Sequence, residues 1–379
     1  MRKYTGWLFV ASALLISACS DDGESTHIQD VGDVDIHIFG PMTEELKAEM
    51  PLLPVKTIDE LGSWPSDITI SSDYAFVVAG NNVIHRIHLD TLEVERNYID
   101  LGQNAAPYSA EADEEALYVA LQGNGTVVKY PHSNPKDSTV VLKDLVAPTA
   151  IYLRDGNIFV TDSEYDYSDP SKTGGKLYAI LKDKGTVVLD TTVQNPGFLE
   201  YCPMFNLIMS VNSGIVTFNQ ETKVSTAPEK SCVDIWKIDN LSTDGEHNPD
   251  WTFCRENTTL GRTYKSSGIL YVGDGLKSSI HAVNILDIPE NKAVFETIKL
   301  SDEAVGLTTP VDLGNQLAVL DFNNDRLYWF EGKKVKTSYR LSESKAAGRG
   351  PIDAVFDTER KQLLILNSNA GSVDVLKRQ

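Results

Sequence analysis

The sequence predicts an all-β protein, a seven-bladed β-propeller with four-stranded antiparallel blades. Short apolar or alternating runs bounded by turn residues indicate strands. These runs repeat every ~40 residues, a period typical of propeller blades, whereas parallel solenoids use shorter repeats. A further strand-like segment precedes the first repeat and is expected to complete the last one.

The last repeat shows the unit clearly. Pro351 opens an alternating run, 357–361 form a turn, and 363–366 are wholly apolar. The turn 367–371 then leads into a final alternating run at 373–376. This succession predicts three short antiparallel strands.

The unit begins at a proline in six places. Successive prolines are 41–48 residues apart, except for one interval of 114 residues that has room for two units, the second beginning near 261–264. The chain is therefore expected to contain seven blades. The opening prolines are Pro65, Pro107, Pro148, Pro196, Pro310 and Pro351.

The seventh repeat supplies only three strands before the chain ends. Residues 53–61 precede the first opening proline, where every other repeat has its fourth strand. We expect this N-terminal strand to complete the last blade, because closing the ring removes the remaining open strand edge.

The first 18 residues have the features of a bacterial lipoprotein signal peptide. Arg2 and Lys3 precede an apolar core at 7–16 that is too short for an ordinary membrane-spanning helix. The cleavage region ends at Cys19 and resembles a lipobox, in which the cysteine is lipidated and becomes the new N-terminus. The resemblance implies an anchor of several acyl chains. Ser20 follows in place of an aspartate, which favours the outer membrane of the cell envelope.

The remaining chain divides into two parts. Residues 19–50 comprise the lipidated cysteine and an acidic tether, and 51–379 form the propeller domain. Within the tether, 35–39 alternate and are expected to pair weakly with another strand.

Composition and motifs limit the range of functions. The formal net charge of −20 argues against a nucleic-acid or anionic-lipid surface, because both require basic side chains. The sequence contains no Gly-x-Ser-x-Gly, His-Glu-x-x-His or phosphate-loop motif and no metal-ligand cluster of cysteines. Hydrolase and nucleotide chemistry therefore have no motif to support them.

The repeats resemble a known family. A proline followed by Ile-Asp or Ser-Asp, a Leu-Tyr-Val strand, an Asn-Gly turn and a Val-x-Val strand are similar to the YVTN or YncE-like seven-bladed propellers of secreted bacterial proteins. The resemblance covers 51–379. It implies an architecture but no particular activity, because such propellers host many functions.

Two repeats carry insertions between their second and third strands, at 162–175 and 213–231. Long loops on a rigid scaffold often carry function, so we expect them to form a binding face, although neutral decoration is an alternative. The first insertion could collect oxygen ligands for Ca²⁺ or could be a solvated acidic loop. Its candidate residues are Asp162, Glu164, Tyr165, Asp166, Tyr167 and Asp169.

Three aspartates follow opening prolines at the same offset in consecutive repeats. Asp67, Asp312 and Asp353 would then crowd one arc of the central channel. Unpaired carboxylates so close together raise one another's pKa, which a divalent metal ion or Arg349 would relieve. The alternative is that each aspartate caps its local backbone turn.

Cysteine usage is consistent with an oxidising compartment. Cys232 and Cys254 flank a hairpin that, centred on residue 243, places them opposite one another, so a cross-strand disulfide is expected. Cys202 would then be free and buried. A Cys202–Cys232 pairing is the alternative.

These observations favour a non-enzymatic module over an enzyme. We expect a monomeric, lipid-anchored propeller without a cofactor that binds an envelope protein or a glycan, or that serves as a subunit of an envelope-assembly machine. The alternative is a channel-site enzyme, either a metal-dependent lactonase-like hydrolase or a quinone-dependent dehydrogenase. The dehydrogenase class resembles eight-bladed propellers with a recurring tryptophan motif, and the five tryptophans here do not recur by blade.

Overall fold

A computed structural model describes residues 36–37, 51–163, 175–219, 224–245, 247–266, 268–300, 308–313, 316–331, 333–341 and 348–378. Residues 36–37, 217–219, 224, 312 and 331 are described by their backbone alone. The expected signal peptide, Cys19 and nearly all of the tether lie outside these ranges.

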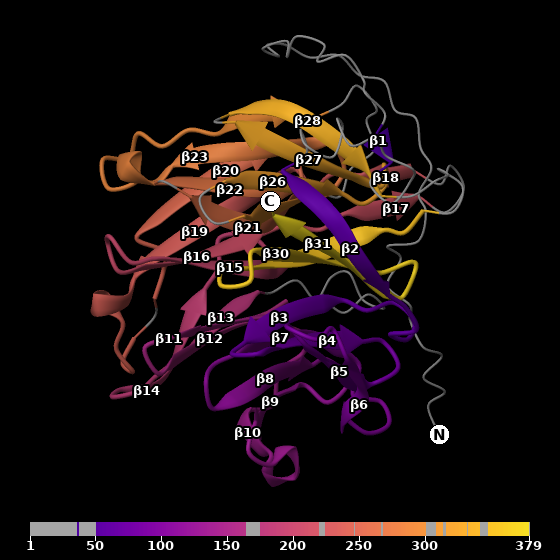
Figure 1. The fold of residues 1–379 in the computed structure, drawn as a ribbon. Helices are drawn as coiled ribbons and strands as arrows, with labels where there is room; N and C mark the ends of the chain where they lie inside the picture. The colour runs from indigo at the N-terminus through magenta and orange to yellow at the C-terminus, as the bar shows by residue number, and fades with distance from the viewer. Residues whose placement is uncertain are drawn as a thin grey trace.

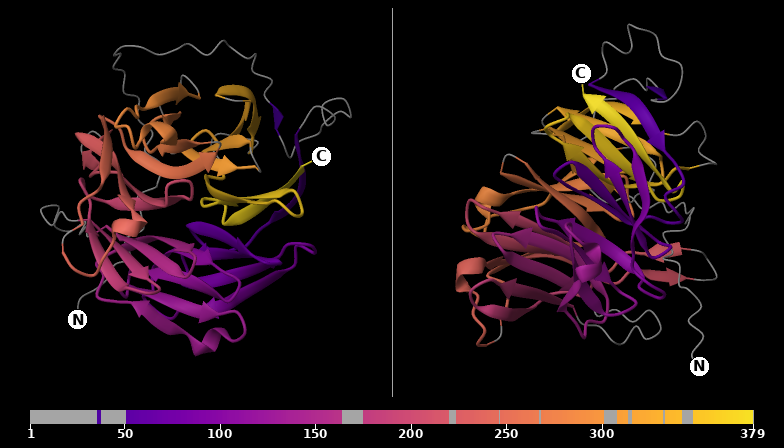
Figure 2. Two further views of the ribbon diagram at one scale, coloured as in Figure 1. Left: turned by 90° about the vertical axis from the view of Figure 1, so that its left-hand side faces the viewer. Right: turned by 60° about the horizontal axis from the view of Figure 1, so that its bottom comes forward.

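The described chain folds into seven blades of four antiparallel strands that follow one another around a central axis (Figures 1 and 2). The predicted fold class is confirmed. The first strand of each blade lies innermost and contacts the first strands of the two neighbouring blades. These inner strands, from blade one to blade seven, are β3 (Asp67–Ser71), β7 (Pro107–Ala112), β11 (Pro148–Arg154), β15 (Pro196–Cys202), β21 (Leu260–Ser266), β25 (Thr308–Asp312) and β29 (Pro351–Asp357).

The other strands follow outward in each blade. The second strands, in blade order, are β4 (Tyr74–Ala79), β8 (Ala116–Leu121), β12 (Asn157–Asp162), β16 (Leu207–Asn212), β22 (Ile269–Asp274), β26 (Leu317–Asp321) and β30 (Gln362–Asn367). The third strands are β5 (Val83–His88), β9 (Thr126–Pro131), β13 (Lys176–Leu181), β19 (Lys230–Lys237), β23 (Ser279–Asn284), β27 (Arg326–Glu331) and β31 (Ser372–Arg378). The outermost strands are β6 (Val94–Asp100), β10 (Thr139–Leu142), β14 (Gly185–Asp190), β20 (Trp251–Glu256), β24 (Glu296–Lys299), β28 (Lys334–Arg340) and β2 (Leu52–Ile58).

Short elements connect or extend the blades. Three 3₁₀ turns follow third strands, and a small two-stranded hairpin occupies the insertion of blade four, which lies between β16 and β19. These elements are η1 (Pro135–Asp137), η2 (Ile238–Asn240), η3 (Ile285–Asp287), β17 (Thr217–Asn219) and β18 (Val224–Thr226).

The N-terminal strand closes the ring, as expected from the sequence. β2 pairs antiparallel with β31, from Leu52 opposite Arg378 to Ile58 opposite Val373. In Figure 1 the indigo β2 lies beside the yellow end of the chain. Leu52 and Ile58 are both buried, so this closure is stabilised by apolar packing as well as by backbone hydrogen bonds.

A two-residue strand of the tether, β1 (Ile36–His37), pairs with the outer edge of blade six. It runs parallel to β28, with Ile36 opposite Tyr339. The weak pairing expected for 35–39 is therefore found at this edge, where it shields unpaired backbone groups of β28.

The core consists of apolar layers between neighbouring blades. Side chains alternate across each strand, so both faces of a blade contribute to a layer. Between blades six and seven, for example, Trp329 and Leu320 pack with Leu363 and Leu376 in one buried cluster. Corresponding clusters lie between the other neighbouring blades.

Candidate functional site

The strand registers define one ring of equivalent positions near the start of the inner strands. Five members are paired with residues of their second strands, as Asp353 is with Leu366 and Asp67 is with Val78. The other two, Ala150 and Arg262, lie within the register shifts of their blades. Opening prolines or their equivalents precede the ring, and a register shift at this point is common to most of the blades. The members, in blade order, are Asp67, Ser109, Ala150, Phe198, Arg262, Thr309 and Asp353.

Asp312 is not a member of this ring. In blade six the inner strand pairs without a shift, and Thr308 rather than Pro310 occupies the position of the other opening prolines. Asp312 is the last residue of β25 and pairs with Leu317, so its backbone lies at the opposite end of the strand from the ring position. The sequence alignment that grouped it with Asp67 and Asp353 was therefore wrong, because it followed the proline instead of the register.

Arg262 of blade five links the two acidic members of the ring. Its Nη2 lies 3.0 Å from Oδ1 of Asp67, and its Nη1 lies 2.9 Å from Oδ1 of Asp353. Nη2 also donates to the backbone carbonyl of Ser66 at 3.1 Å. Since the two aspartates belong to blades one and seven, the Arg262 side chain crosses the bore. A single guanidinium thus compensates both carboxylates.

The same aspartates also join neighbouring blades. Oδ2 of Asp67 accepts a hydrogen bond from the backbone N–H of Ala110 in blade two at 2.8 Å. Oδ2 of Asp353 accepts one from the N–H of Ile68 in blade one at 3.1 Å. At the corresponding position of blade six, the Thr309 hydroxyl donates to a backbone carbonyl of blade seven. The ring position therefore holds adjacent inner strands together, which differs from the alternative that each aspartate caps its local turn.

Burial has the largest effect on the pKa of Asp353. It raises the pKa of Asp353 well above the usual range, Arg262 opposes the shift, and Asp67 adds to it. The cation that relieves the repulsion is Arg262 and not Arg349, because Arg349 instead binds Asp374 at 2.7 Å in blade seven.

A second titratable group lies beside the bore on the next inner strand. Burial, with the carboxylates of Asp67 and Glu200, raises the pKa of Glu111 to about 8. Burial also raises the pKa of Tyr152 in blade three, and the nearby carboxylates of Glu200 and Glu111 raise it further. Lys265 of blade five lies 3.9 Å from Glu200. Several carboxyl groups therefore lie close together here, with Arg262 and Lys265 as cationic partners.

A cavity of about 80 Å³ opens beside the ring, over the starts of the inner strands of blades two to four. Phe198 lines it and also lies under Arg262, whose Cζ is 5.6 Å from the ring centroid. The lining combines two aromatic rings with hydroxyl and amide groups and contains no charged side chain. It includes Tyr108, Gln122, Thr149, Asn195, Phe198 and Ser213.

Part of the expected binding loop is described. Asp162 ends β12, and its carboxylate accepts hydrogen bonds from the backbone N–H groups of Val146 and Ala147, the latter at 2.6 Å. This carboxylate therefore stabilises the connection into blade three. Glu164, Tyr165, Asp166, Tyr167 and Asp169 lie outside the described residues.

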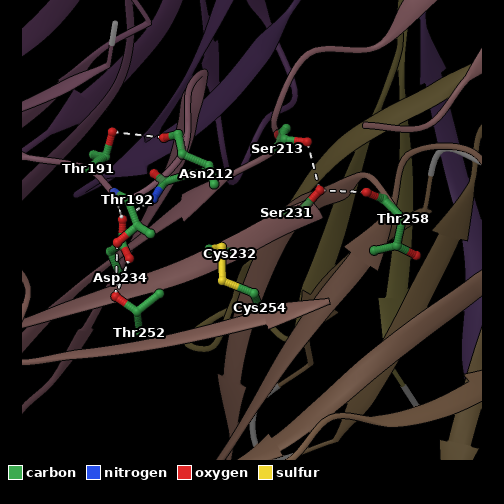
Figure 3. The surroundings of a disulfide bond; sticks show 11 residues. Thr191, Thr192, Asn212, Ser213, Ser231, Cys232, Asp234, Thr252, Cys254 and Thr258 are labelled. Atoms are coloured by element: carbon green, nitrogen blue, oxygen red, sulfur yellow. Dashed lines mark hydrogen bonds between the residues drawn. A yellow bond between two sulfur atoms is a disulfide. The ribbon is translucent and has the colours of Figure 1, made fainter. Parts of the chain in front are cut away.

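A disulfide joins Cys232 to Cys254, the pair favoured by the sequence (Figure 3). The two cysteines face each other across β19 and β20, in the register centred on residue 243. Cys202 is free and buried. The disulfide therefore fastens the edge strand of blade four.

Hydrogen bonds on both sides of the disulfide anchor the base of the insertion (Figure 3). The Ser231 hydroxyl contacts the carbonyls of Ser213 and Thr258. Asp234 accepts hydrogen bonds from Asn212, and from the Thr252 hydroxyl at 2.7 Å. Both ends of the insertion are thus held rigidly, close to the cavity that Ser213 lines.

Arg262 is the functional candidate that sequence reasoning missed. Blade five lacks an opening proline, so the repeat begins there without its usual marker, and Arg262 was not aligned with Asp67 and Asp353. Leu260 occupies the position of the missing proline, and the only signal in the sequence was the arginine two residues after it.

Two features are absent from the described part of the chain. Within these ranges, no group of three or more histidine, cysteine, aspartate or glutamate side chains is placed to hold a metal ion. No helix in the described part of the chain is long and apolar enough to cross a membrane.

Comparison with known proteins supports the architecture. No family model and no curated protein matches the sequence. A streptogramin B lyase structure is similar, with a TM-score of 0.59 at 10% identity, over 86% of this chain and 97% of that one. Virginiamycin B lyase from Staphylococcus aureus is also similar, with a TM-score of 0.59 at 11% identity, over 86% of this chain and 99% of that one. A catalytically inactive variant of the same lyase, with quinupristin, gives a TM-score of 0.60 at 11% identity with the same coverage. At these identities, the likeness establishes a shared propeller fold.

Proposed function

We propose that this protein is a lipid-anchored, extracytoplasmic binding module of the bacterial envelope, carried by a rigid propeller. Its partner is an envelope protein or a glycan, and its acyl anchor at Cys19 keeps it on the outer membrane. The observation that carries the proposal is Arg262, which occupies the space between Asp67 and Asp353 and satisfies both carboxylates. The acidic pair then stabilises the ring instead of activating a substrate.

The main experiment measures metal in the purified protein. Residues 20–379 are prepared from the periplasm and analysed by elemental analysis, beside an Asp67→Ala/Asp312→Ala/Asp353→Ala variant. A binding module whose acidic pair is neutralised by Arg262 is expected to contain no stoichiometric metal. Stoichiometric metal that disappears in the variant would contradict the proposal and favour a metal-dependent enzyme.

The similarity to lyases motivates a second assay. The neighbours act on streptogramin B and virginiamycin B, so the purified protein is incubated with virginiamycin B beside a lyase as a positive control. A binding module is expected to leave the compound unchanged. Turnover that is lost in a channel variant would replace the binding role with an enzymatic one.

The anchor is tested separately. Cys19→Ser is expected to move the protein from the membrane fraction to the soluble periplasmic fraction, because the acyl chains supply the membrane affinity. If the variant remains in the membrane fraction, the lipoprotein assignment is wrong.

A further inference from the structure

The cavity beside the ring has a chemical character that differs from that of the bore. Its polar lining is uncharged and consists of hydroxyl groups, such as those of Thr149 and Ser213, and of amides from Gln122 and Asn195. The guanidinium of Arg262, which lies over the cavity-lining Phe198, is already paired with two carboxylates. An ionic ligand would therefore find no available countercharge on these side chains.

The cavity offers several acceptors and at least one free donor group. The Ser213 hydroxyl donates its proton to the carbonyl of Leu260, which leaves oxygen lone pairs directed elsewhere. Asn195 donates through its Nδ2 to the carbonyl of Gly214, so its Oδ1 remains an acceptor. Among the described residues, none forms a hydrogen bond with the Gln122 side chain, whose amide can both donate and accept. A ligand with many hydroxyl groups would match this arrangement.

Aromatic rings complete the lining. Tyr108 of blade two and Phe198 of blade four present apolar surface to the cavity. Aromatic rings combined with a few fixed polar groups are typical of small-molecule sites. The C–H face of a sugar packs on such a ring while its hydroxyl groups bind amides and hydroxyls.

We infer that this cavity is a binding site for a neutral sugar ring, presented by a glycan at the mouth of the bore. This inference rests on the proposed binding role and selects the glycan over the protein as the partner. At about 80 Å³ the cavity accepts part of one ring, so the remainder of the glycan would extend outward from the propeller.

Gly197 gives a specific way to block the site. It lines the cavity, and a Cβ added there would meet only the Ser213 Oγ, at 3.9 Å, which is an ordinary contact. Gly197→Ala is therefore expected to fold normally while its methyl group takes up part of the space for the sugar. Gly261 occupies the equivalent place in blade five, does not line the cavity, and has room for a Cβ 3.5 Å from the carbonyl of Gly273. Gly261→Ala is the matched control.

The test uses methyl glycosides of glucose, galactose and N-acetylglucosamine as probes with the purified propeller. Saturation-transfer NMR and titration are expected to show binding of at least one glycoside, with a dissociation constant on the order of 1 mM for a single ring. Gly197→Ala should weaken this binding by roughly tenfold or more, because the substituted methyl group competes for the cavity. Gly261→Ala should bind as the wild type does.

Gln122 provides a second, independent variant. Gln122→Ala is expected to weaken glycoside binding roughly three- to tenfold, the effect of losing a neutral hydrogen bond. Asn124 lies in the same turn and is exposed, so Asn124→Ala controls for effects on the turn itself. Melting curves of all four variants establish that they are folded.

Two results would overturn the inference. If the wild type binds none of the glycosides at 50-fold above the expected constant, the cavity is not a sugar site. If a glycoside binds but Gly197→Ala leaves its affinity unchanged, the sugar lies elsewhere. An envelope protein bound by the wild type in the absence of glycoside binding would overturn the sugar site but leave the binding module standing. Stoichiometric bound metal, or turnover of virginiamycin B, in the assays described above would instead contradict the proposed binding role itself.

Discussion

Arg262 and Asp353 form an ion pair of 2.9 Å although a whole blade lies between them in the ring. The contact is possible because both residues occupy the same inner-strand position, from which side chains can meet across the bore. Arg262 reaches Asp67 of blade one as well, so three blades that are not all neighbours are joined at one point. The Arg262 side chain therefore links the inner strands of blades five, seven and one across the bore.

The first prediction concerns Arg262→Met, which retains a long side chain but removes the charge. The variant leaves the Asp67 and Asp353 carboxylates without their cation, and it is expected to lower the free energy of unfolding by about 3 kcal/mol at neutral pH. The lower end of the range for buried pairs applies because 23% of the Arg262 side chain is exposed. Chemical denaturation measures the change.

The triple variant Arg262→Met/Asp67→Asn/Asp353→Asn is the control. It removes the unpaired charges while retaining most of the volume, so it should recover most of the lost stability. If Arg262→Met alone matches the wild type within about 0.5 kcal/mol, the proposed role of Arg262 in holding the ring is wrong.

The second prediction concerns Glu111 and pH. Since the pKa of Glu111 is about 8 in the folded protein and 4.5 in its ordinary state, the folded chain keeps a proton that the unfolded chain has lost between these values. Stability should therefore fall as pH rises through this window. Glu111→Gln removes the titration, so its melting temperature relative to the wild type should be higher at pH 9 than at pH 5.

Melting curves recorded in parallel at pH 5, 7 and 9 check this prediction. The difference between the two proteins should grow from pH 5 to about pH 8 and then level off, because in this window the unfolded wild type ionises Glu111 while the folded protein keeps it protonated. A constant difference across the three pH values would mean that Glu111 does not titrate in this window.

The fold was predictable because its signals are local and repeated. Strand runs, turns and opening prolines recur in the sequence, and the segment before Pro65 supplies the missing strand. Hairpin register favoured the pairing of Cys232 with Cys254 over that with Cys202, and the structure confirms it. Each of these inferences requires only residues close in the chain or a count of repeats.

The candidate site was less predictable because it depends on contacts across the bore. Arg262 and Asp67 are 195 residues apart, and no repeat marker placed Arg262 in the ring. Asp312 was misplaced because its proline lies two residues later in the strand than the others, a shift that only the pairing with β26 reveals. Register and side-chain reach are tertiary properties.

The third prediction concerns the disulfide. Cys232→Ser/Cys254→Ser is expected to lower the free energy of unfolding by about 3 kcal/mol, since the bond closes a segment with a sequence separation of 22. A reducing agent should destabilise the wild type, because Cys254 is exposed on an edge strand, but should leave the variant unchanged. Thiol titration of the denatured wild type should detect a single free thiol among Cys202, Cys232 and Cys254, and three thiols would show that the disulfide does not form.

The last prediction tests closure of the ring by β2. Leu52 is fully buried between blades six and seven, whereas Val55 of the same strand is 52% exposed. Leu52→Ala removes buried apolar volume and is expected to lower the free energy of unfolding by about 3 kcal/mol. Val55→Ala changes the same strand on its exposed side and should cost less than about 1 kcal/mol. Chemical denaturation of the two variants compares them directly, and equal effects would show that β2 does not seal the ring through its buried face.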